Sequence, residues 1–547
     1  MTELLDIFKA RIKSGLARSS VTSCSKWAET YREMGKPYPG LWRWEHHPWL
    51  REMHDCNASQ TVGQKSAQMG FTEWALNTVF YSIDILRIDT LYVLPSSHPD
   101  ASDFSAARFD PALELSDHLY RLFSDVKNVG HKRAGSTNLY IRGSKSRSQL
   151  KSIPAGLLIL DELDEMMQEN ISLAMERTSG QREEDKRVLM LSTPTVEGYG
   201  INAHFKASDQ RHFFFKCPCC SRYTELVFPD CMEIIGEHPT QDIVMTSFLK
   251  CKECKGKLEH KDKKIWLAQN EWVKSYDQRT SAGFYVNQLY SSTVSPGDLA
   301  KAYLTSLTDK SAEQEFYNSK LGLTHAVEGA SVTDKDIQAA RGEYKNGTHA
   351  EGFLTMGVDV GVKLHYAIRQ WYFNPVVIGD LNATARCRTL KYGTVLHFHE
   401  LDEIMYQFRP KMVVIDAQPE RRKAHEFSMR FPGDVRVCFY VGGIRGKQIH
   451  QTKEDVEYGI SVDRTSWLDL TLGRFHAKSI SIPADVDEEY QSHLKCLVRI
   501  YDKDKDGNPI GKYVKGGGDD HYAHAENYAE IAFAIASGRG SNQTIYE

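Results

Sequence analysis

The sequence predicts an α/β protein built on parallel β-sheets, and three short segments support this class. Segments 90–96, 157–160 and 412–415 are rich in apolar residues and end at turn-forming or acidic residues. Such runs are typical of strands buried on both faces of a parallel sheet. Two of them end in an acid, Asp161 and Asp416, and the carboxyl ends of such strands are where open α/β sheets bind ligands.

Length and composition limit the classes of protein that the chain can belong to. Its 547 residues suffice for two or three domains. A net charge of −4 excludes a globally basic nucleic-acid-binding protein, so contacts with nucleic acid must be local. We find no signal peptide and no apolar run of about 18 residues, so no membrane span is expected.

A nucleotide site is predicted upstream of Asp161, where residues 64–73 read Q-K-S-A-Q-M-G-F-T-E. In the phosphate loop G-x-x-x-x-G-K-S/T, Gly70 and Thr72 would take the late glycine and hydroxyl positions. Phe71 replaces the usual lysine, while Lys65, at the place of the first glycine, would reach the β/γ-phosphates from the other side. The alternative is a glycine-containing turn before a helix, with a solvated acidic turn after the strand. The expected nucleotide contacts are Gln64, Lys65, Ser66, Ala67, Gln68, Met69, Gly70, Phe71 and Thr72, with Asp161 on Mg²⁺ and Glu162 orienting the attacking water.

Two segments precede this loop. Residues 1–45 are expected to form a helical arm, which either packs on the core or contacts another subunit. The aromatic and proline-rich segments 38–44 and 47–50 either cover an adenine base or pack in the core.

Residues 131–160 carry lysines and arginines, among them Lys132, Arg142 and Lys145, but no acid. In a chain of net negative charge this favours phosphate-backbone contact over a merely solvated face.

Further on, the strand 187–191 ends in hydroxyl groups that can sense a phosphate, or form a simple turn. These hydroxyls are those of Ser192 and Thr193, and Arg177 is a possible arginine finger in an unspecified subunit.

Two C-x-x-C pairs predict a zinc ribbon, because two tight turns can deliver four thiolates to one tetrahedral ion. In a chain without a secretion signal, metal binding is favoured over disulfides. The expected ligands of a structural Zn²⁺ are Cys217, Cys220, Cys251 and Cys254, with Cys219 as an extra cysteine in the first pair.

The last third of the chain predicts an RNase H-like sheet with a metal-dependent hydrolytic site. A strand with Asp359 is followed by strands at 366–371 and 376–379, a helix at 395–408 and the strand ending in Asp416. Asp520 opens a further helix that runs to residue 536. The three acids, each of which alone is more often a cap or turn residue, together suit two Mg²⁺ or Mn²⁺ ions that cleave a phosphodiester. Asp519 competes with Asp520, and His521 or His524 would assist.

Residues 64–73 and 157–165 together resemble the ATPase of the terminase large subunits of tailed bacteriophages, in the branch typified by phage lambda. That branch is similar in its K-S-A-Q-x-G-F/Y-S/T-E loop with the displaced lysine. Segments 217–220, 283–291 and 316–322 resemble the branch as well, so the likeness covers nearly the whole chain. Ser192 and Thr193 look like the motif that couples the γ-phosphate to motion. Gly361 stands where the branch more often has glutamine.

The resemblance implies a viral DNA-packaging motor. Such a protein uses ATP to translocate double-stranded DNA into the procapsid through the portal protein, and cuts concatemeric DNA with a metal-dependent endonuclease. It would use ATP, Mg²⁺ (or Mn²⁺) and Zn²⁺, and act with the portal protein, the small terminase subunit and further copies of itself in a ring, in the host cytoplasm and away from membranes. The implied domains are a helical arm (1–45), the ATPase (46–205), a zinc-ribbon and linker region (206–345), the nuclease (346–540) and a short tail (541–547).

Two other functions fit parts of this pattern. A repair or defence helicase-nuclease would also combine both catalytic sites. A zinc-containing DNA-binding scaffold with degenerate sites would explain the non-standard phosphate loop.

Overall fold

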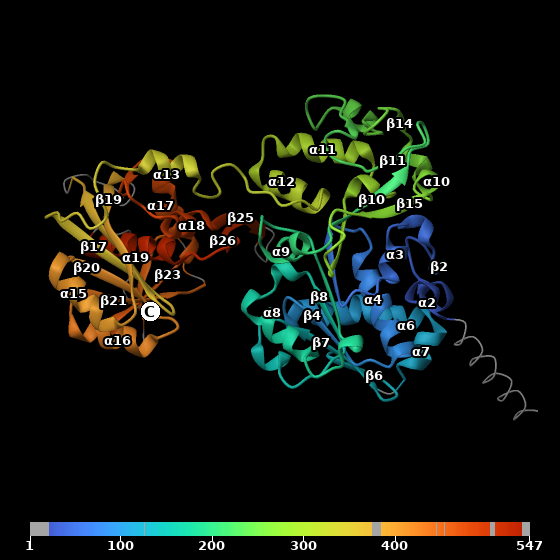
Figure 1. Ribbon diagram of the computed structural model, residues 1–547, viewed down its shortest axis with the longest axis horizontal. Helices are drawn as coiled ribbons and strands as arrows, with labels where there is room; N and C mark the ends of the chain where they lie inside the picture. The colour runs from blue at the N-terminus through green and yellow to red at the C-terminus, as the bar shows by residue number, and fades with distance from the viewer. Residues whose placement is uncertain are drawn as a thin grey trace, which may run out of the picture. The chain divides into compact units, whose positions relative to one another are not determined.

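The computed structural model divides the chain into two compact units, Met1–His325 and Ala326–Glu547 (Figure 1). It describes residues 21–124, 126–374, 384–442, 444, 446–452, 455–503 and 509–538. Most of the predicted arm helix, the strand at 376–379 and the tail at 541–547 lie outside these residues.

A large mixed sheet forms the centre of the first unit, and its middle strands are all parallel. The predicted α/β class is therefore confirmed. In spatial order the parallel strands are β10 (Arg211–Lys216), β16 (Ala282–Val286), β3 (Gln60–Lys65), β9 (Arg187–Ser192), β8 (Leu157–Asp161), β4 (Thr90–Leu94) and β7 (Thr137–Gly143). Antiparallel strands extend both edges: β11 (Tyr223–Thr224) and β15 (Asn270–Lys274) beside β10, and β6 (His131–Ala134) and β5 (Val126–Asn128) beyond β7.

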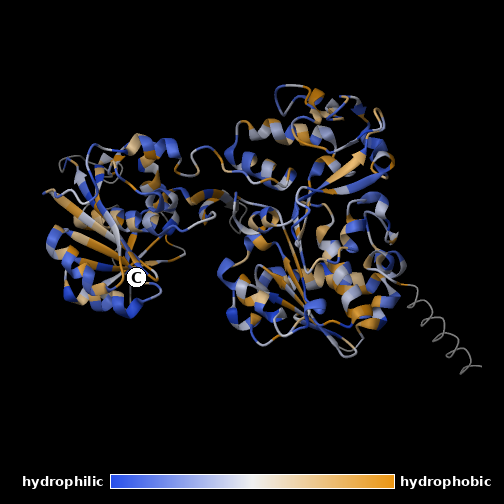
Figure 2. Cartoon of the chain, in the orientation of Figure 1, coloured by the Kyte–Doolittle hydropathy of each residue, from blue (hydrophilic) through white to orange (hydrophobic). Residues whose placement is uncertain are grey.

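Both faces of this sheet are covered by helices, which explains why its strands are apolar throughout. Along β8, Leu157 and Ile159 enter one hydrophobic core, while Leu158 and Leu160 enter another on the opposite face. The first core is completed by α2 (Cys24–Tyr31), α3 (Leu50–His54), α4 (Phe71–Tyr81), α6 (Asp110–Leu115) and α7 (Asp117–Leu122), the second by α8 (Gln168–Met175) and α9 (Gly200–Ala207). Apolar residues accordingly concentrate on the strands (Figure 2). No helix among the described residues is long and apolar enough to span a membrane.

The region expected to be a separate linker, 206–345, contributes strands to this same sheet. β16 lies between β10 and β3, so the first compact unit continues to His325 and has no boundary at residue 205. A separate small antiparallel sheet of β12 (Met232–Glu233), β13 (Phe248–Lys250) and β14 (Lys257–Leu258) is inserted in the sequence between β11 and β15. The functional division of the chain stays a prediction.

The second unit has the predicted RNase H-like order of strands. Three antiparallel strands, β17 (Phe353–Val360), β18 (Leu364–Tyr372) and β19 (Arg386–Val395), are followed by β20 (Met412–Asp416) parallel to β17. The sheet continues with β21 (Val435–Tyr440), β23 (Asp455–Val462) and β22 (Ile449–Thr452), and ends with β24 (Ile480–Ser481) beside β19. Its main helices are α15 (Phe398–Phe408), α16 (Arg421–Arg430), α17 (Arg464–His476), α18 (Glu488–Lys495) and α19 (His521–Ala536).

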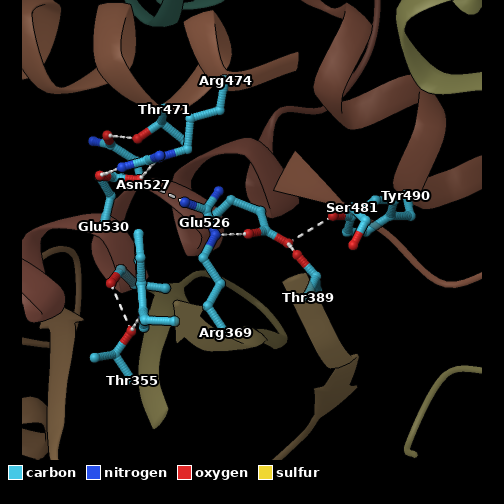
Figure 3. A network of polar contacts seen from close by, with 12 residues as sticks. Thr355, Arg369, Thr389, Thr471, Arg474, Ser481, Tyr490, Glu526, Asn527 and Glu530 are labelled. Carbon is cyan, nitrogen blue, oxygen red and sulfur yellow. Dashed lines mark hydrogen bonds and ion pairs between the residues drawn. The ribbon is translucent and has the colours of Figure 1, made fainter. Parts of the chain in front are cut away.

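Helix α19 packs against this sheet and is fixed there by buried charges (Figure 3). Glu530 accepts hydrogen bonds from Arg369 (2.7 Å) and from two nitrogens of Arg474 (2.6 and 2.7 Å). Glu526 accepts from Arg369, from Tyr490 (2.6 Å) and from the Thr389 hydroxyl (2.8 Å). Because both glutamates and Arg369 are fully buried, these contacts fix the position of the whole helix.

Replacing Glu530 with glutamine should therefore destabilise the second unit by about 3–5 kcal/mol, since two buried arginines lose part of their counter-charge. Urea unfolding, followed by hydrogen exchange of α19 peptides, measures the effect. Glu426→Gln is the matched control: its pair with Arg422 is exposed and contributes about 1 kcal/mol or less. Equal unfolding midpoints for the two variants would contradict this account of α19.

Candidate nucleotide, zinc and nuclease sites

The predicted nucleotide residues gather at the carboxyl edge of the first sheet, where β3, β9 and β8 are neighbours. Lys65 ends β3 and Asp161 ends β8, so both side chains meet at this edge. The Lys65 ammonium donates a 2.9 Å hydrogen bond to Glu162. Tyr92, on the adjacent strand β4, donates a 2.5 Å hydrogen bond to Asp161. No local motif marks this tyrosine.

Asp161 is buried, and its electrostatics suit a cation. Burial, and next the charge of Glu162, raise its pKa to about 6, whereas Lys65 and the Tyr92 hydroxyl act in the opposite direction. Its Oδ1 atom is buried without a hydrogen-bond partner among the described residues, and so is the Ser66 hydroxyl. Buried polar atoms normally have partners. These two atoms therefore fit a bound Mg²⁺-nucleotide.

Glu162 has a left-handed backbone conformation, with φ of 60°. A residue other than glycine rarely adopts this conformation, and such strain clusters at functional sites. In this conformation the Glu162 side chain, which is 40% exposed, lines a pocket of about 500 Å³. The other residues lining this pocket are Leu94, Pro95, Asp100, Asp103, Lys145 and Glu165.

The structure divides the predicted phosphate loop into two parts. The amides of Ser66 and Ala67 donate to the carbonyls of Val286 (3.1 Å) and Ser319 (2.7 Å). The Gln64 side chain donates to Gly322 O (2.9 Å) and accepts from Asn202 (3.1 Å). These groups hold the loop in place, and their contact with phosphate stays a prediction.

The second part of the loop has the geometry of an anion site. Gln68 and Gly70 have positive φ angles of 60° and 81°, and α4 begins directly afterwards at Phe71. The first amides of a helix have no intrahelical partner and attract anions. Phosphate contact is therefore favoured at the amides of residues 70–72.

The aromatic segment before the loop packs in the core at one residue and lines a pocket at another. Trp49 is buried in the core, with its indole donating to Met69 O at 2.9 Å. Tyr38, stacked on His46 with ring centroids 3.5 Å apart, lines a pocket of about 300 Å³ that reaches Gly70. An aromatic-lined pocket next to the phosphate loop suits an adenine base.

A residue that the sequence analysis did not single out, Asp164, connects the acidic turn after β8 with the turn after β9. Its carboxylate accepts hydrogen bonds from the amide and hydroxyl of Thr195 (both 2.8 Å) and from the amide of Ile201 (2.7 Å). Its own amide donates to the Ser192 hydroxyl at 3.2 Å. Gly200 makes room, since a Cβ there would lie 2.3 Å from the carboxylate. Ser192 and Thr195 thus contribute the two hydroxyls of this connection, while the predicted coupling role of Ser192 and Thr193 stays a prediction.

Two other predicted residues lie away from the nucleotide site of their own chain. The Arg177 carbonyl accepts from the amide of Ala155, at the amino end of β8. At about 3.3 Å per residue, this point is roughly 20 Å from Asp161, so Arg177 lies away from the nucleotide site of its own chain. Lys132 is buried and paired with Asp110 at 2.7 Å, which removes it from the predicted DNA contacts.

The four cysteines predicted to bind zinc lie close together. The sulfurs of Cys217, Cys220, Cys251 and Cys254 all lie within 4.8 Å of one another. The Cys217 and Cys254 sulfurs are 4.0 Å apart, close to the roughly 3.8 Å expected between thiolates that share a tetrahedral Zn²⁺. The Cys219 sulfur instead lies 3.8 Å from Lys257 O, outside this group. The set therefore fits a closed structural Zn²⁺ site.

The predicted nuclease acids come from β17, the end of β20 and the start of α19. Burial, and next the charge of Asp359, raise the pKa of Asp416 to about 7. Burial also raises the pKa of Asp520, but His524 at 3.3 Å and Lys515 at 3.4 Å lower it more strongly. The pKa of Asp520 therefore lies well below the usual range. Asp519 is largely exposed and pairs with Lys515, which favours Asp520 as the inward acid.

Asp359 is closely accompanied by two histidines. His521 Nδ1 lies 2.8 Å from Asp359 Oδ2, and this contact raises the pKa of His521. His365 stacks on His521, with ring centroids 4.4 Å apart. Burial lowers the pKa of His365 to about 4. No sequence motif marks His365, because it reaches Asp359 only through strand pairing.

A nucleotide-binding parallel sheet followed by an RNase H-like unit defines a motor joined to a nuclease. Two family models match the chain: "Phage terminase large subunit gpA, ATPase domain" over residues 37–272, and "Terminase large subunit gpA, endonuclease domain" over residues 281–375. Together they cover more than half of it. The chain therefore belongs to the phage terminase large subunits and carries the ATPase and endonuclease activities of a DNA-packaging motor. The lambda-like branch is consistent with the gpA family.

Solved structures of large terminases are similar to this chain. The large terminase of bacteriophage HK97 is similar with a TM-score of 0.52 and 10% identity, over 94% of this chain and 99% of that one. The large terminase of the thermophilic bacteriophage D6E gives a TM-score of 0.30 and 10% identity, over 86% and 93%. Only the first likeness bears on the fold. No curated protein sequence matches the chain.

Replacing Asp164 with asparagine tests its connecting role. Asparagine has one acceptor oxygen and one NH₂ group, so it cannot accept from Thr195 on one side and from the Ile201 amide on the other, and each hydrogen bond to a charged acceptor is worth about 1.5–3 kcal/mol. We expect ATP hydrolysis to fall roughly tenfold or more while nucleotide affinity stays unchanged, as measured by steady-state turnover and fluorescent-nucleotide titration. Glu183→Gln, on an exposed turn, is the control. Unchanged hydrolysis in Asp164→Asn would exclude this role.

Proposed function

We propose that Lys65, Asp161 and Glu162 are the hydrolytic residues of the packaging ATPase. The observation that carries this proposal is the Lys65–Glu162 contact, made beside a buried oxygen of Asp161 that has no hydrogen-bond partner within the described part of the chain. Asp161 and the Thr72 hydroxyl would hold Mg²⁺, which neutralises phosphate charge when bound. The amides of residues 70–72 would bind the phosphates, and the pocket beside Tyr38 the adenine.

The Lys65–Glu162 pair also suggests how hydrolysis is restrained without nucleotide. While Lys65 holds the Glu162 carboxylate, this carboxylate cannot orient water freely. A phosphate oxygen competes for the same ammonium, so Lys65 turns to the nucleotide and Glu162 becomes free to orient the attacking water and accept its proton. Asp164 would pass the change on to the turn after β9.

Substituting Glu162 with glutamine should leave ATP binding intact and lower hydrolysis by about 10²–10⁴-fold, because the amide cannot act as a base. Nucleotide titration and steady-state turnover of the full chain separate the two effects. Glu169→Gln provides an exposed control on the following helix. Turnover at the wild-type rate would remove Glu162 from this role.

For the endonuclease we propose that Asp359, Asp416 and Asp520 bind two divalent ions, Mg²⁺ or Mn²⁺. Bound ions would activate water and stabilise the leaving oxygen. The raised pKa of Asp416 supports a site that needs a cation, since ionised Asp359 and Asp416 repel each other without one. His521 would orient Asp359, and His524 would orient Asp520.

We further propose that Cys217, Cys220, Cys251 and Cys254 bind a structural Zn²⁺. In the wild-type chain we expect about one zinc per chain, and Cys254→Ser should lose most of it because a hydroxyl is a poor zinc ligand. Cys219→Ser, one residue from a ligand, should keep it. Elemental analysis after dialysis decides, and equal zinc content in both variants would contradict the assignment.

The proposed partners are double-stranded DNA, the portal protein, the small terminase subunit and further copies of this chain in a ring, in the host cytoplasm. The distance of Arg177 from its own site supports the ring, because a finger acting on a neighbour needs adjacent copies. From the basic stretch at 131–160, Lys145 remains a candidate for DNA contact, and it lines the pocket beside Glu162. Family membership favours packaging over the repair helicase-nuclease and the scaffold.

A further inference from the structure

Tyr92 brings a phenol hydroxyl into the nucleotide site from a neighbouring strand. It lies on β4, where it pairs in register with Ile159 of β8, and both side chains belong to the same hydrophobic core. Ile159 and Asp161 share a face of the sheet, because successive side chains of a strand alternate between faces. Tyr92 is 1% exposed and packs on Phe104, with ring centroids 4.5 Å apart. Its hydroxyl therefore has a fixed position beside Asp161.

The two oxygens of the Asp161 carboxylate differ in what they contact. Oδ2 accepts the hydrogen bond from the Tyr92 hydroxyl at 2.5 Å. Oδ1 is buried and has no hydrogen-bond partner in the part of the chain that the structure describes. A hydrogen bond to one oxygen restricts the rotation of the carboxylate, so the direction of the other oxygen is restricted as well. Tyr92 therefore determines where Asp161 can offer a ligand atom.

The same hydrogen bond affects the choice of partner for Lys65. The Lys65 ammonium, at the end of β3, pairs with Glu162 at 2.9 Å. A buried carboxylate without donors would attract the nearest cation, since a buried and uncompensated charge is costly. The Tyr92 hydroxyl meets part of this need at Asp161. Lys65 can therefore stay with Glu162, which is the pair that the proposed restraint of hydrolysis requires.

We propose that Tyr92 is a positioning residue of the ATPase: by holding one oxygen of Asp161, it directs the other toward the Mg²⁺ of the nucleotide and leaves Lys65 to Glu162. The inference rests on the proposed nucleotide site and adds to it a residue that acts through Asp161. Mg²⁺ requires nearly octahedral geometry, so a misdirected carboxylate binds it poorly. Residues that orient a metal ligand through a hydrogen bond commonly change the metal affinity by about 10–100-fold.

A purely structural role of Tyr92 does not account for this contact. Packing on Phe104 requires only an aromatic ring, and phenylalanine would supply it without a hydroxyl to bury. A buried tyrosine hydroxyl usually finds a hydrogen-bond partner. In this chain the partner is the carboxylate that is proposed to hold the metal, and the bond leaves the second oxygen of this carboxylate unused.

Replacing Tyr92 with phenylalanine in the full-length protein removes only the hydroxyl and tests the proposal. Mn²⁺, as a probe for the Mg²⁺ site, is titrated with and without ADP and followed by EPR of the free ion, and the ADP-dependent part reports on the nucleotide site. We expect the Mn²⁺ dissociation constant of this part to rise about tenfold or more in Tyr92→Phe. The affinity for fluorescent ADP in EDTA should stay at the wild-type value, because the hydroxyl acts on the metal ligand.

Tyr140→Phe is the matched control. It removes a hydroxyl from the neighbouring strand β7, where the ring stacks on His131 with centroids 4.8 Å apart. Both affinities should remain at the wild-type values in this variant. An unchanged Mn²⁺ dissociation constant in Tyr92→Phe, or an equal loss of ADP affinity in EDTA, would overturn the positioning role.

Asp161→Asn shows which claim has failed. If this variant weakens the ADP-dependent Mn²⁺ binding and Tyr92→Phe does not, the inference about Tyr92 is wrong while the proposed ATPase site stands. If neither variant weakens it, Asp161 does not hold the metal, and the proposed site and the inference are both wrong.

Discussion

The burial of carboxylates at the ends of parallel strands is the constraint on which both sites depend. Asp161 and Asp416 each end an apolar strand that is covered on both faces, and burial raises the pKa of both toward neutrality. An ionised acid in such a place needs a cation or donors nearby. In the first unit Lys65 and Tyr92 supply them for Asp161, and in the second the Gln418 amide donates to Asp416 at 3.1 Å and His524 lies near it. The same arrangement thus creates places for Mg²⁺ or a related ion.

Because of the order of strands, the nucleotide site belongs to a network of hydrogen bonds between neighbouring turns. Because β9 lies between β3 and β8, the turn after β9 touches the acidic turn through Asp164. Asn318 donates to the Thr195 carbonyl at 2.8 Å, and the neighbouring Ser319 accepts from the Ala67 amide of the phosphate loop. The segment around residue 318 therefore contacts both nucleotide-facing turns. It ends at His325, directly before the second unit begins in the sequence.

Local sequence was sufficient for the features that depend on neighbouring residues. The strands ending at Asp161 and Asp416, the cysteine pairs and the helix after Asp520 could all be predicted, because an apolar run or a short spacing determines them. Features that depend on distant pairing could not. His365 lies near Asp359 only because the two residues are paired across neighbouring strands. Asp164 accepts hydrogen bonds from a turn about thirty residues later. The internal use of Gln64 and the place of β16 within the sheet likewise arise only from tertiary contacts.

The central claim is that one chain holds two separate catalytic centres, each built on acids at strand ends. The most direct test measures plasmid cleavage and ATP turnover in the same samples, for the wild type and Asp416→Ala, with Mg²⁺ or Mn²⁺. The account predicts that cleavage depends on the divalent ion and disappears in the variant, while ATP turnover persists. Cleavage that persists in Asp416→Ala, or a loss of both activities in a variant that remains folded, would contradict it.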